Sequence, residues 1–140
     1  MSNINTNDLD DWAKTLLEYA SSDMPKKNKK FIQNEGNKLR KNTLSKAKSL
    51  TNKKTGNYYK GIKRGKVYHY RDKNNNSVRV YGGSSHAHLI EYPHRIIVNG
   101  VEKGMSKGKY VFEKSAKEFE SEFNKDCENY AEDILKELSK

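Results

Sequence analysis

The C-terminal residues 110–140 read YVFEKSAKEFESEFNKDCENYAEDILKELSK and form the most regular pattern in this chain of 140 residues. Apolar or small side chains recur there every three or four residues, at Phe112, Ala116, Phe119, Phe123, Cys127 (or Asp126), Tyr130, Ile134 and Leu138. This spacing places them on one face of an α-helix, while Glu and Lys fill most of the other face. The segment therefore predicts a long amphipathic helix with aromatic anchors.

Two shorter helices are expected in the N-terminal third. Residues 7–20, NDLDDWAKTLLEYA, carry acids in the first turn and apolar residues at helical spacing. SSDMP, at 21–25, is expected to break this helix, and a second helix begins near Pro25 with Asp23 as its cap. The second helix ends near Thr51. It is basic except for a narrow inward stripe of Ile32, Gly36, Leu39, Thr43, Ala47 and Leu50.

The middle of the chain has the period of β-strands. Residues 67–71 and 78–82 alternate between two faces on either side of a polar turn at 72–77, which predicts an antiparallel hairpin. Residues 86–92, HAHLIEY, are expected to form a third extended segment that stops at Pro93.

A second, shorter hairpin is expected around Asn99-Gly100, because this dipeptide suits a type I′ turn. Residues 103–109, KGMSKGK, are expected to be a flexible loop. The predicted class is α+β: two N-terminal helices, a small antiparallel sheet of about four strands, and a long C-terminal helix packing on the sheet. We expect one domain with four parts, namely an acidic helix in 1–24, a basic helix in 25–54, a sheet region in 58–104 and the terminal helix in 110–140.

Composition limits the classes of protein to consider. Only 33% of the residues are hydrophobic, so the core is thin for this length, and association with partners is expected to add stability. No apolar run is long enough to span a membrane, and the polar, acidic N-terminus argues against a secretory signal. The single cysteine, Cys127, cannot form an intramolecular disulfide, which favours a reducing cytosol.

The net charge of +10 is unevenly distributed. Residues 25–80 carry 18 Lys and Arg against Glu35 and Asp72, a net of +16, whereas residues 1–24 and 111–140 each have a net of −4. Three interpretations are open: a surface for nucleic-acid phosphates, opposite patches that meet between neighbouring copies, or a solvated surface without a partner.

Two groups of residues are candidate chemical sites. His86 and His88 would share one face of a strand, with Glu91 and His94 nearby, which suits a first-row metal; two polar residues on an exposed strand face are the simpler alternative. Basic residues interleaved with tyrosines between 58 and 71 resemble a platform for single-stranded nucleic acid, although tyrosine is also favoured in any half-buried sheet.

No convincing catalytic group emerges, so the chain is not expected to be an enzyme or to need a cofactor. A nuclease would need clustered acids for metals or a His–Asn/Asp centre, and the sheet region has few acids. Cys127 lies on or beside the apolar stripe of the terminal helix, where a small core residue is the expected role.

Three local features together resemble one family. Residues 55–62, TGNYYKGI, are similar to the Thr-Gly-x-Leu-x-x-Ser-Ile turn that is typical of the small head–tail joining proteins of tailed bacteriophages, and residues 86–92 are similar to that family's Tyr-Ala-x-x-Val-Glu-Phe-Gly strand. A glycine-containing loop then leads through 110–112 to Ala116 and a long terminal helix, where the family has an aromatic residue and Pro-Ala. The chain departs from the pattern in having Gly61 for Ser, Pro93 for Gly and Ser115 for Pro.

The resemblance implies a structural virion protein of a phage neck, or of a headless tail-like particle, assembled in the cytoplasm of a bacterial host. It implies a homo-oligomeric ring, a hexamer or dodecamer, that contacts head-completion or connector proteins, tail-tube or tail-terminator proteins and, transiently and non-specifically, duplex DNA. We expect no membrane partner. The residues assigned to the subunit interface or to the DNA-facing lumen are Lys53, Lys54, Thr55, Gly56, Lys60, Lys63, Arg64, Lys66 and Glu91.

Glu91 is expected to lie on a strand, where its carboxylate could pair with a Lys or Arg of its own or of an adjacent subunit. Two other functions stay open. One is a regulatory protein whose basic helix, residues 25–52, binds nucleic acid, and the other is a metal-dependent nuclease built on His86 and His88.

Overall fold

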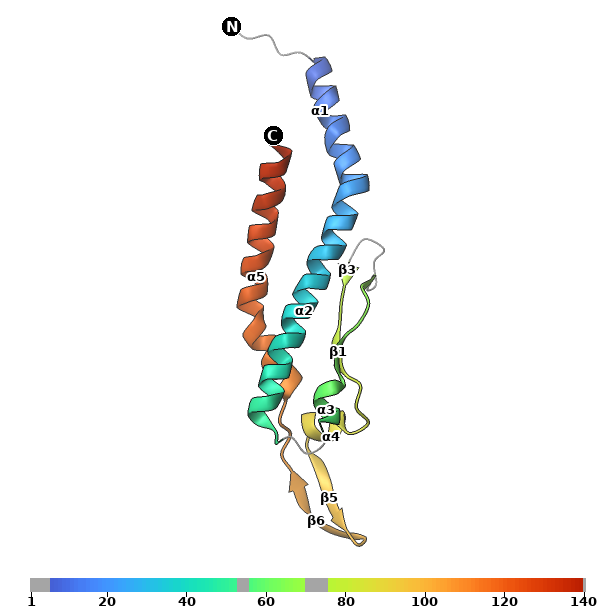
Figure 1. Cartoon of the computed structure of the whole chain (residues 1–140), viewed down its shortest axis with the longest axis vertical. Coiled ribbons are helices and arrows are strands. Elements are labelled where there is room, and N and C mark those ends of the chain that lie inside the picture. Colours follow the sequence, from blue (N-terminus) through green and yellow to red (C-terminus); the bar gives the residue numbers. More distant parts are fainter. Residues whose placement is uncertain (1–5, 53–55, 70–75, 140) are drawn as a thin grey trace.

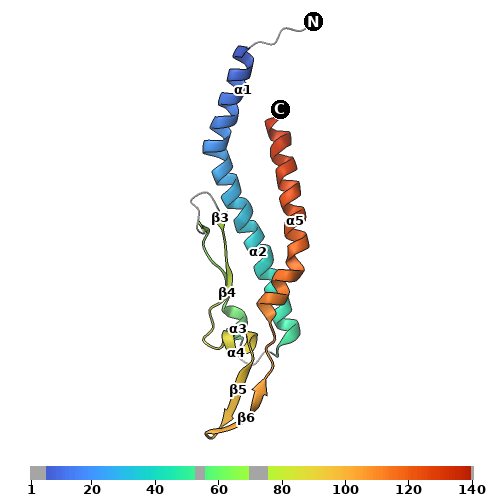
Figure 2. The same ribbon diagram turned by 180° about the vertical axis from the view of Figure 1, so that it is seen from behind.

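The structure, a computed structural model, describes residues 6–52, 56–69 and 76–139 of an elongated molecule (Figure 1). A long N-terminal helical rod occupies the middle and runs antiparallel to the C-terminal helix α5 (Val111–Leu138). A narrow β-ribbon lies along the rod on the side opposite to α5, and a separate hairpin projects from the lower end in both views (Figure 2). The predicted α+β class, with its long terminal helix, is confirmed.

The rod consists of α1 (Thr6–Glu18), a π-helical segment (Tyr19–Asp23) and α2 (Met24–Leu50). The predicted break at 21–25 is therefore wrong, and Asp23 has helical backbone angles and makes no side-chain cap. In the π-helical segment the N–H of Met24 bonds to the carbonyl of Tyr19, five residues back. Widening the turn in this way lets the chain accept Pro25, which has no N–H to donate, without ending the helix. The predicted end of α2 at Thr51 is confirmed.

Helices α2 and α5 pack along most of their length. The rings of Phe31 and Tyr130 stack with centroids 4.3 Å apart, and the Tyr130 hydroxyl donates to Asn28. Nearer the other end of the pair, Ser115 is fully buried, and its hydroxyl lies 2.8 Å from that of Thr43. The predicted stripe on α2 is confirmed, since Gly36, Thr43 and Ala47 are among its buried residues. On α5, Phe119 is buried as expected, but Ala116 is exposed and Ser115 takes the inward position.

The ribbon consists of four short strands in two antiparallel pairs. Strand β1 (Ile62–Arg64) pairs with β4 (Val80–Gly82), and β2 (Tyr68–His69) pairs with β3 (Asn76–Ser77). The partner of 80–82 is thus 62–64 and not the predicted 67–71, while 68–69 pair with 76–77. The register shifts by one residue between the two pairs.

Gly36 explains how closely this ribbon approaches α2. A Cβ at this position would lie 2.9 Å from both Arg64 Cδ and Val78 Cγ1. A glycine in the middle of a helix costs about 1 kcal/mol relative to alanine. Here its missing side chain leaves the room that the ribbon occupies.

The last pair, β5 (His94–Val98) and β6 (Val101–Ser106), forms the projecting hairpin. Asn99 and Gly100 both have positive φ, 53° and 78°, as the predicted type I′ turn requires. The segment 103–109 was expected to be a loop, but its first half continues β6. The four-stranded sheet of the prediction is therefore three separate two-stranded pairs.

A small core lies where these elements meet. Ala47, Ile62 and Val111 are fully buried, and Val80 and Phe112 pack against them. The first turn of α5 thus packs against the β1–β4 pair, while the rest of the helix packs against α2.

Candidate functional site: a basic groove and two uncovered ends

A hollow at the lower end of the molecule, lined by several lysines, is called the basic groove here. It has a volume of about 890 Å³ and is formed by the end of α2, the short helices α3 (Asn57–Lys60) and α4 (Ala87–Glu91), and the base of the β5–β6 hairpin. Its lining residues are Leu50, Thr51, Asn52, Gly56, Asn57, Tyr58, Tyr59, Lys60, Gly61, Lys63, Gly83, Ser84, Ser85, His86, Leu89, Ile90, His94, Ser106, Lys107 and Lys109.

The lining carries positive charge without a compensating acid. Four lysines contribute, Lys60, Lys63, Lys107 and Lys109, and none of the lining residues is Asp or Glu. All four side chains belong to exposed residues, so their ammonium groups are available to an anionic partner. The groove is therefore electropositive along its rim.

The floor of the groove is apolar and contains two buried polar atoms. Leu50, Tyr59 and Ile90 line the groove and also pack against the core. Within the described part of the chain, the Tyr58 hydroxyl and His94 Nδ1 are buried and have no hydrogen-bond partner. Burial, reinforced by the charge of Glu91, raises the pKa of Tyr58 to about 12, so its hydroxyl keeps its proton at neutral pH.

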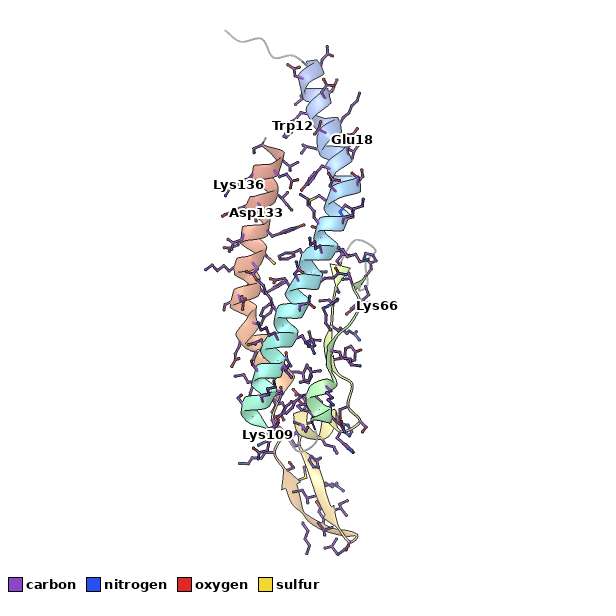
Figure 3. The ribbon with its side chains drawn as sticks, viewed as in Figure 1. Trp12, Glu18, Lys66, Lys109, Asp133 and Lys136 are labelled. Atoms are coloured by element: carbon purple, nitrogen blue, oxygen red, sulfur yellow. The ribbon has the colours of Figure 1, made fainter. Side chains whose placement is uncertain are left out.

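The structure brings together some of the predicted interface residues and separates others. Lys60 and Lys63 line the groove, and so does Gly56, whose φ of 80° turns the chain into α3. Arg64 instead faces α2, where its Nε donates to Asn37 at 2.7 Å. Lys66 lies on the ribbon, away from Lys109 at the base of α5 (Figure 3). The remaining three, Lys53, Lys54 and Thr55, lie outside the described residues.

Glu91 has a role that the sequence did not indicate. It ends α4, is 6% exposed, and its carboxylate accepts hydrogen bonds from the backbone N–H groups of Phe112 and Glu113 at the start of α5. Glu91 is therefore on a helix and not on the expected strand, and within the described residues its carboxylate binds backbone N–H groups; pairing with a lysine or arginine of an adjacent subunit stays a prediction. Tyr110, just before α5, has a left-handed backbone with φ of 51° and caps nothing with its side chain, so Glu91 supplies the cap from a distant segment.

The predicted strand 86–92 is a helix, which changes the position of the histidines. His86 precedes α4 and His88 lies within it, so the two imidazoles do not share a face as they would on a strand. Ala87 and Ile90, three residues apart, are both half-buried, and this helical spacing was the overlooked signal. Across residues 6–52, 56–69 and 76–139, no three His, Cys, Asp or Glu side chains gather into a possible metal site.

Opposite charges meet along the α2–α5 contact. Lys38 Nζ lies 2.8 Å from Asp126, and the pairs Lys27–Glu137 and Lys46–Glu118 flank it. The spacing between the three lysines along α2 equals the spacing between their three partners along α5, in the opposite direction. These pairs therefore fix the register of the two antiparallel helices. Part of the basic middle of the sequence thus faces the acidic C-terminal part within one chain.

One carboxyl group lies buried at the centre of this contact. Glu35 is 3% exposed, and burial, together with the neighbouring Asp126, raises its pKa to about 7. Cys127 follows Asp126 and is half-buried, and burial raises the pKa of its thiol. A thiol with a raised pKa is a poor nucleophile, which agrees with the structural role expected for it.

Both ends of the molecule expose apolar side chains. On α1, Leu9, Trp12 and Leu17 are 59%, 57% and 70% exposed, and the first turns of this helix extend past the end of α5 (Figures 1 and 3). The apolar residues of the hairpin are also exposed: Ile96, Ile97, Val98, Val101 and Met105. Within the hairpin, β5 and β6 pack mainly against each other and not against the body of the molecule.

None of the helices in the described ranges is both long and apolar enough to cross a membrane. Comparisons with protein-family models, with curated proteins and with solved structures found no match for this chain.

Proposed function

We propose that this chain is a structural subunit of a phage neck or of a related tail-like particle, and that it works as a homo-oligomeric ring at the head–tail junction. The observation that carries the proposal is the β5–β6 hairpin, which projects from the body with five apolar side chains exposed. An isolated two-stranded hairpin is marginally stable in water, and exposed apolar clusters mark contact sites.

The elongated shape supports the same proposal. The chain places uncovered apolar residues at two opposite ends, on α1 and on the hairpin, as a subunit with neighbours on more than one side would. Two different patches on one subunit suit a heterologous interface, which closes into a ring when the rotation between copies allows it. The sequence resemblance to head–tail joining proteins supplies the biological setting, which includes a location in the virion neck, connector and tail partners, and passage of DNA.

Nucleic-acid binding by helix 25–52 is the second candidate. Three of the lysines of α2 are paired with acids of α5, which leaves Lys26, Lys29, Lys30, Lys41 and Lys48 as its exposed lysines without such a pair. A regulatory protein acting through this face would bind duplex DNA with an affinity that falls steeply with salt.

The test is to measure the mass and shape of the purified full chain, alone and mixed with portal, connector and tail-terminator proteins from the same genome, where that genome encodes them. Closed rings by negative-stain imaging, with the corresponding mass, are expected in at least one mixture. A chain that stays monomeric in every mixture would contradict the proposal, and tight salt-sensitive DNA binding by that monomer would favour the second candidate.

A further inference from the structure

We propose that the basic groove receives the acidic helix α1 of a second copy of this chain. This inference rests on the proposed function, because it names the contact by which neighbouring subunits join. It is drawn from two uncovered surfaces of the same chain that match in both charge and apolar character.

The first surface is α1, which we call the acidic arm. It carries Asp8, Asp10, Asp11 and Glu18 against the single base Lys14. Its apolar residues Leu9 and Trp12 lie three positions apart, on one side of the helix, and each is more than half exposed. An aromatic residue and a leucine flanked by carboxylates would be an unfavourable surface in water if nothing covered it.

The second surface is the basic groove, whose properties are the complement of the arm. Its floor is apolar, through Leu50, Leu89 and Ile90, and its rim holds four exposed lysines with no acid among the lining residues. Apolar side chains of the arm can cover the floor while its carboxylates face the lysines. Charge complementarity of this kind selects the partner and its orientation, and burial of Trp and Leu supplies affinity.

The two surfaces lie at opposite ends of the elongated chain, so the arm is placed to reach a groove in another copy (Figures 1 and 3). Trp12 belongs to the upper end and Lys109 to the lower end. Contacts that join one patch to a different patch on the next copy continue from subunit to subunit. They close into the ring that the proposed function requires when the rotation between successive copies allows it.

A nucleic acid is the competing occupant, and the floor of the groove favours the protein. Binding of single strands depends on aromatic rings that are free to stack with bases. Tyr58 and Tyr59 are half-buried and pack against the core, and the Tyr59 hydroxyl is within 2.8 Å of Thr51. Among the described residues that line the groove there is also no arginine, the residue that most often combines phosphate binding with stacking.

The single tryptophan makes the proposal directly testable. Trp12 is the only tryptophan of the chain, so its emission reports on the arm alone. We expect a shift to shorter wavelength as protein concentration rises or as rings form on neck partners, in step with the mass from sedimentation. Lys60→Glu with Lys109→Glu should abolish both changes. Lys29→Glu with Lys41→Glu, which reverses the same charge on exposed lysines of α2 outside the groove, should leave them intact.

An exchange of charges between the two surfaces distinguishes loss of a specific contact from misfolding of the variants. The arm variant Asp10→Lys with Asp11→Lys should also fail to assemble alone, but an equimolar mixture with the groove variant should recover assembly, since each reversed surface finds its complement. Rings that form while Trp12 keeps its monomer emission, or that tolerate the groove variant, would overturn this inference and leave the proposed function standing. Failure to assemble under any condition would overturn both. A groove variant that loses affinity for DNA but assembles normally would assign the groove to nucleic acid instead.

Discussion

The carboxylate of Glu91 accepts the backbone N–H of Phe112 at 3.0 Å, and this bond joins the end of α4 to the start of α5. The backbone of the same segment strengthens the junction, because the carbonyl of Glu91 accepts the N–H of Tyr110 and that of Ile90 accepts the N–H of Lys109. A negative charge at a helix N-terminus also interacts favourably with the helix dipole. Glu91 therefore fixes the point at which the terminal helix leaves the hairpin.

Glu91→Ala is expected to lower the free energy of unfolding by about 1–3 kcal/mol, because it leaves buried N–H groups of α5 without an acceptor. Glu91→Gln should cost less, since an amide oxygen still accepts one bond but carries no charge. Urea denaturation followed by circular dichroism measures both. Glu113→Gln is the matched control: its exposed side chain pairs only with Lys117 among the described ion pairs, and little change is expected. Equal stability of Glu91→Ala and the wild type would contradict the capping role.

Glu35 makes stability depend on pH near neutrality. Burial first, and then the hydrogen bond and charge of Asp126, raise its folded-state pKa to about 7 from an ordinary value of 4.5, while Lys38 and Glu122 add opposing smaller effects. Because the folded pKa is the higher one, the stabilising contribution is fully present below about pH 4.5 and is lost as pH rises through about 7. The loss amounts to about 3 kcal/mol over that window.

Asp126 acts in the opposite direction at low pH. Its hydrogen bond to Lys38, followed by that to Glu35, lowers the pKa of its carboxyl, so its contribution is lost as pH falls below the ordinary range of aspartate. Stability should therefore be greatest near pH 4 to 5 and should decline toward pH 7. Denaturation midpoints between about pH 4 and 8 are expected to fall as pH rises in the wild type and to stay flat in Glu35→Gln. A wild-type protein with constant stability from about pH 5 to 8 would show that Glu35 is not buried as described.

The sequence predicted the elements with strong periodicity and missed those set by tertiary contacts. The stripes of α2 and α5 follow from a helical repeat that any long amphipathic segment displays. Asn99-Gly100 identified its hairpin because the turn itself requires positive φ. By contrast, HAHLIEY alternates polar and apolar residues at its start, and this alternation masks the helical spacing of Ala87 and Ile90. In the structure Ala87 lies against Gly82, and α4 packs against α5.

The candidate site was less predictable than the fold. Lys60 and Lys63 were expected to belong to it, but Lys107 and Lys109 reach the same groove from far along the chain, through the hairpin that separates them from α4. No local sequence pattern predicts that residues so far apart in the chain line one groove. The burial of Glu35 and the capping by Glu91 are similar cases, since a carboxylate looks the same in a sequence whether water, a lysine or a helix N-terminus surrounds it.

Gly108 is expected to tolerate no side chain. A Cβ at this position would lie 2.6 Å from the carbonyl oxygen of Glu91 and 3.0 Å from the backbone nitrogen of Pro93, and backbone atoms cannot move aside as a flexible side chain can. Gly108→Ala should therefore destabilise the chain by about 1–3 kcal/mol through overpacking. Gly65→Ala is the control, because the nearest atoms to its Cβ would be at 3.6 Å, an ordinary contact. Thermal unfolding of both variants tests this expected loss of stability. A Gly108→Ala protein as stable as Gly65→Ala would contradict the close approach of Gly108 to the backbone of Glu91 and Pro93.

The exposed hairpin should matter for assembly and little for the fold of the single chain. Ile97 and Val101 are 63% and 54% exposed, so replacing both by aspartate removes few contacts within the body. We expect unchanged helical content and at most a small fall in the unfolding midpoint, but loss of ring formation with neck partners, because charge replaces apolar area at the contact. Leu135→Asp alters an equally exposed apolar residue on α5, 64% exposed, and should assemble as the wild type does. If the hairpin variant forms rings normally while Leu135→Asp does not, the assembly surface lies on the helices, and the hairpin loses its place as the observation that carries the proposed function.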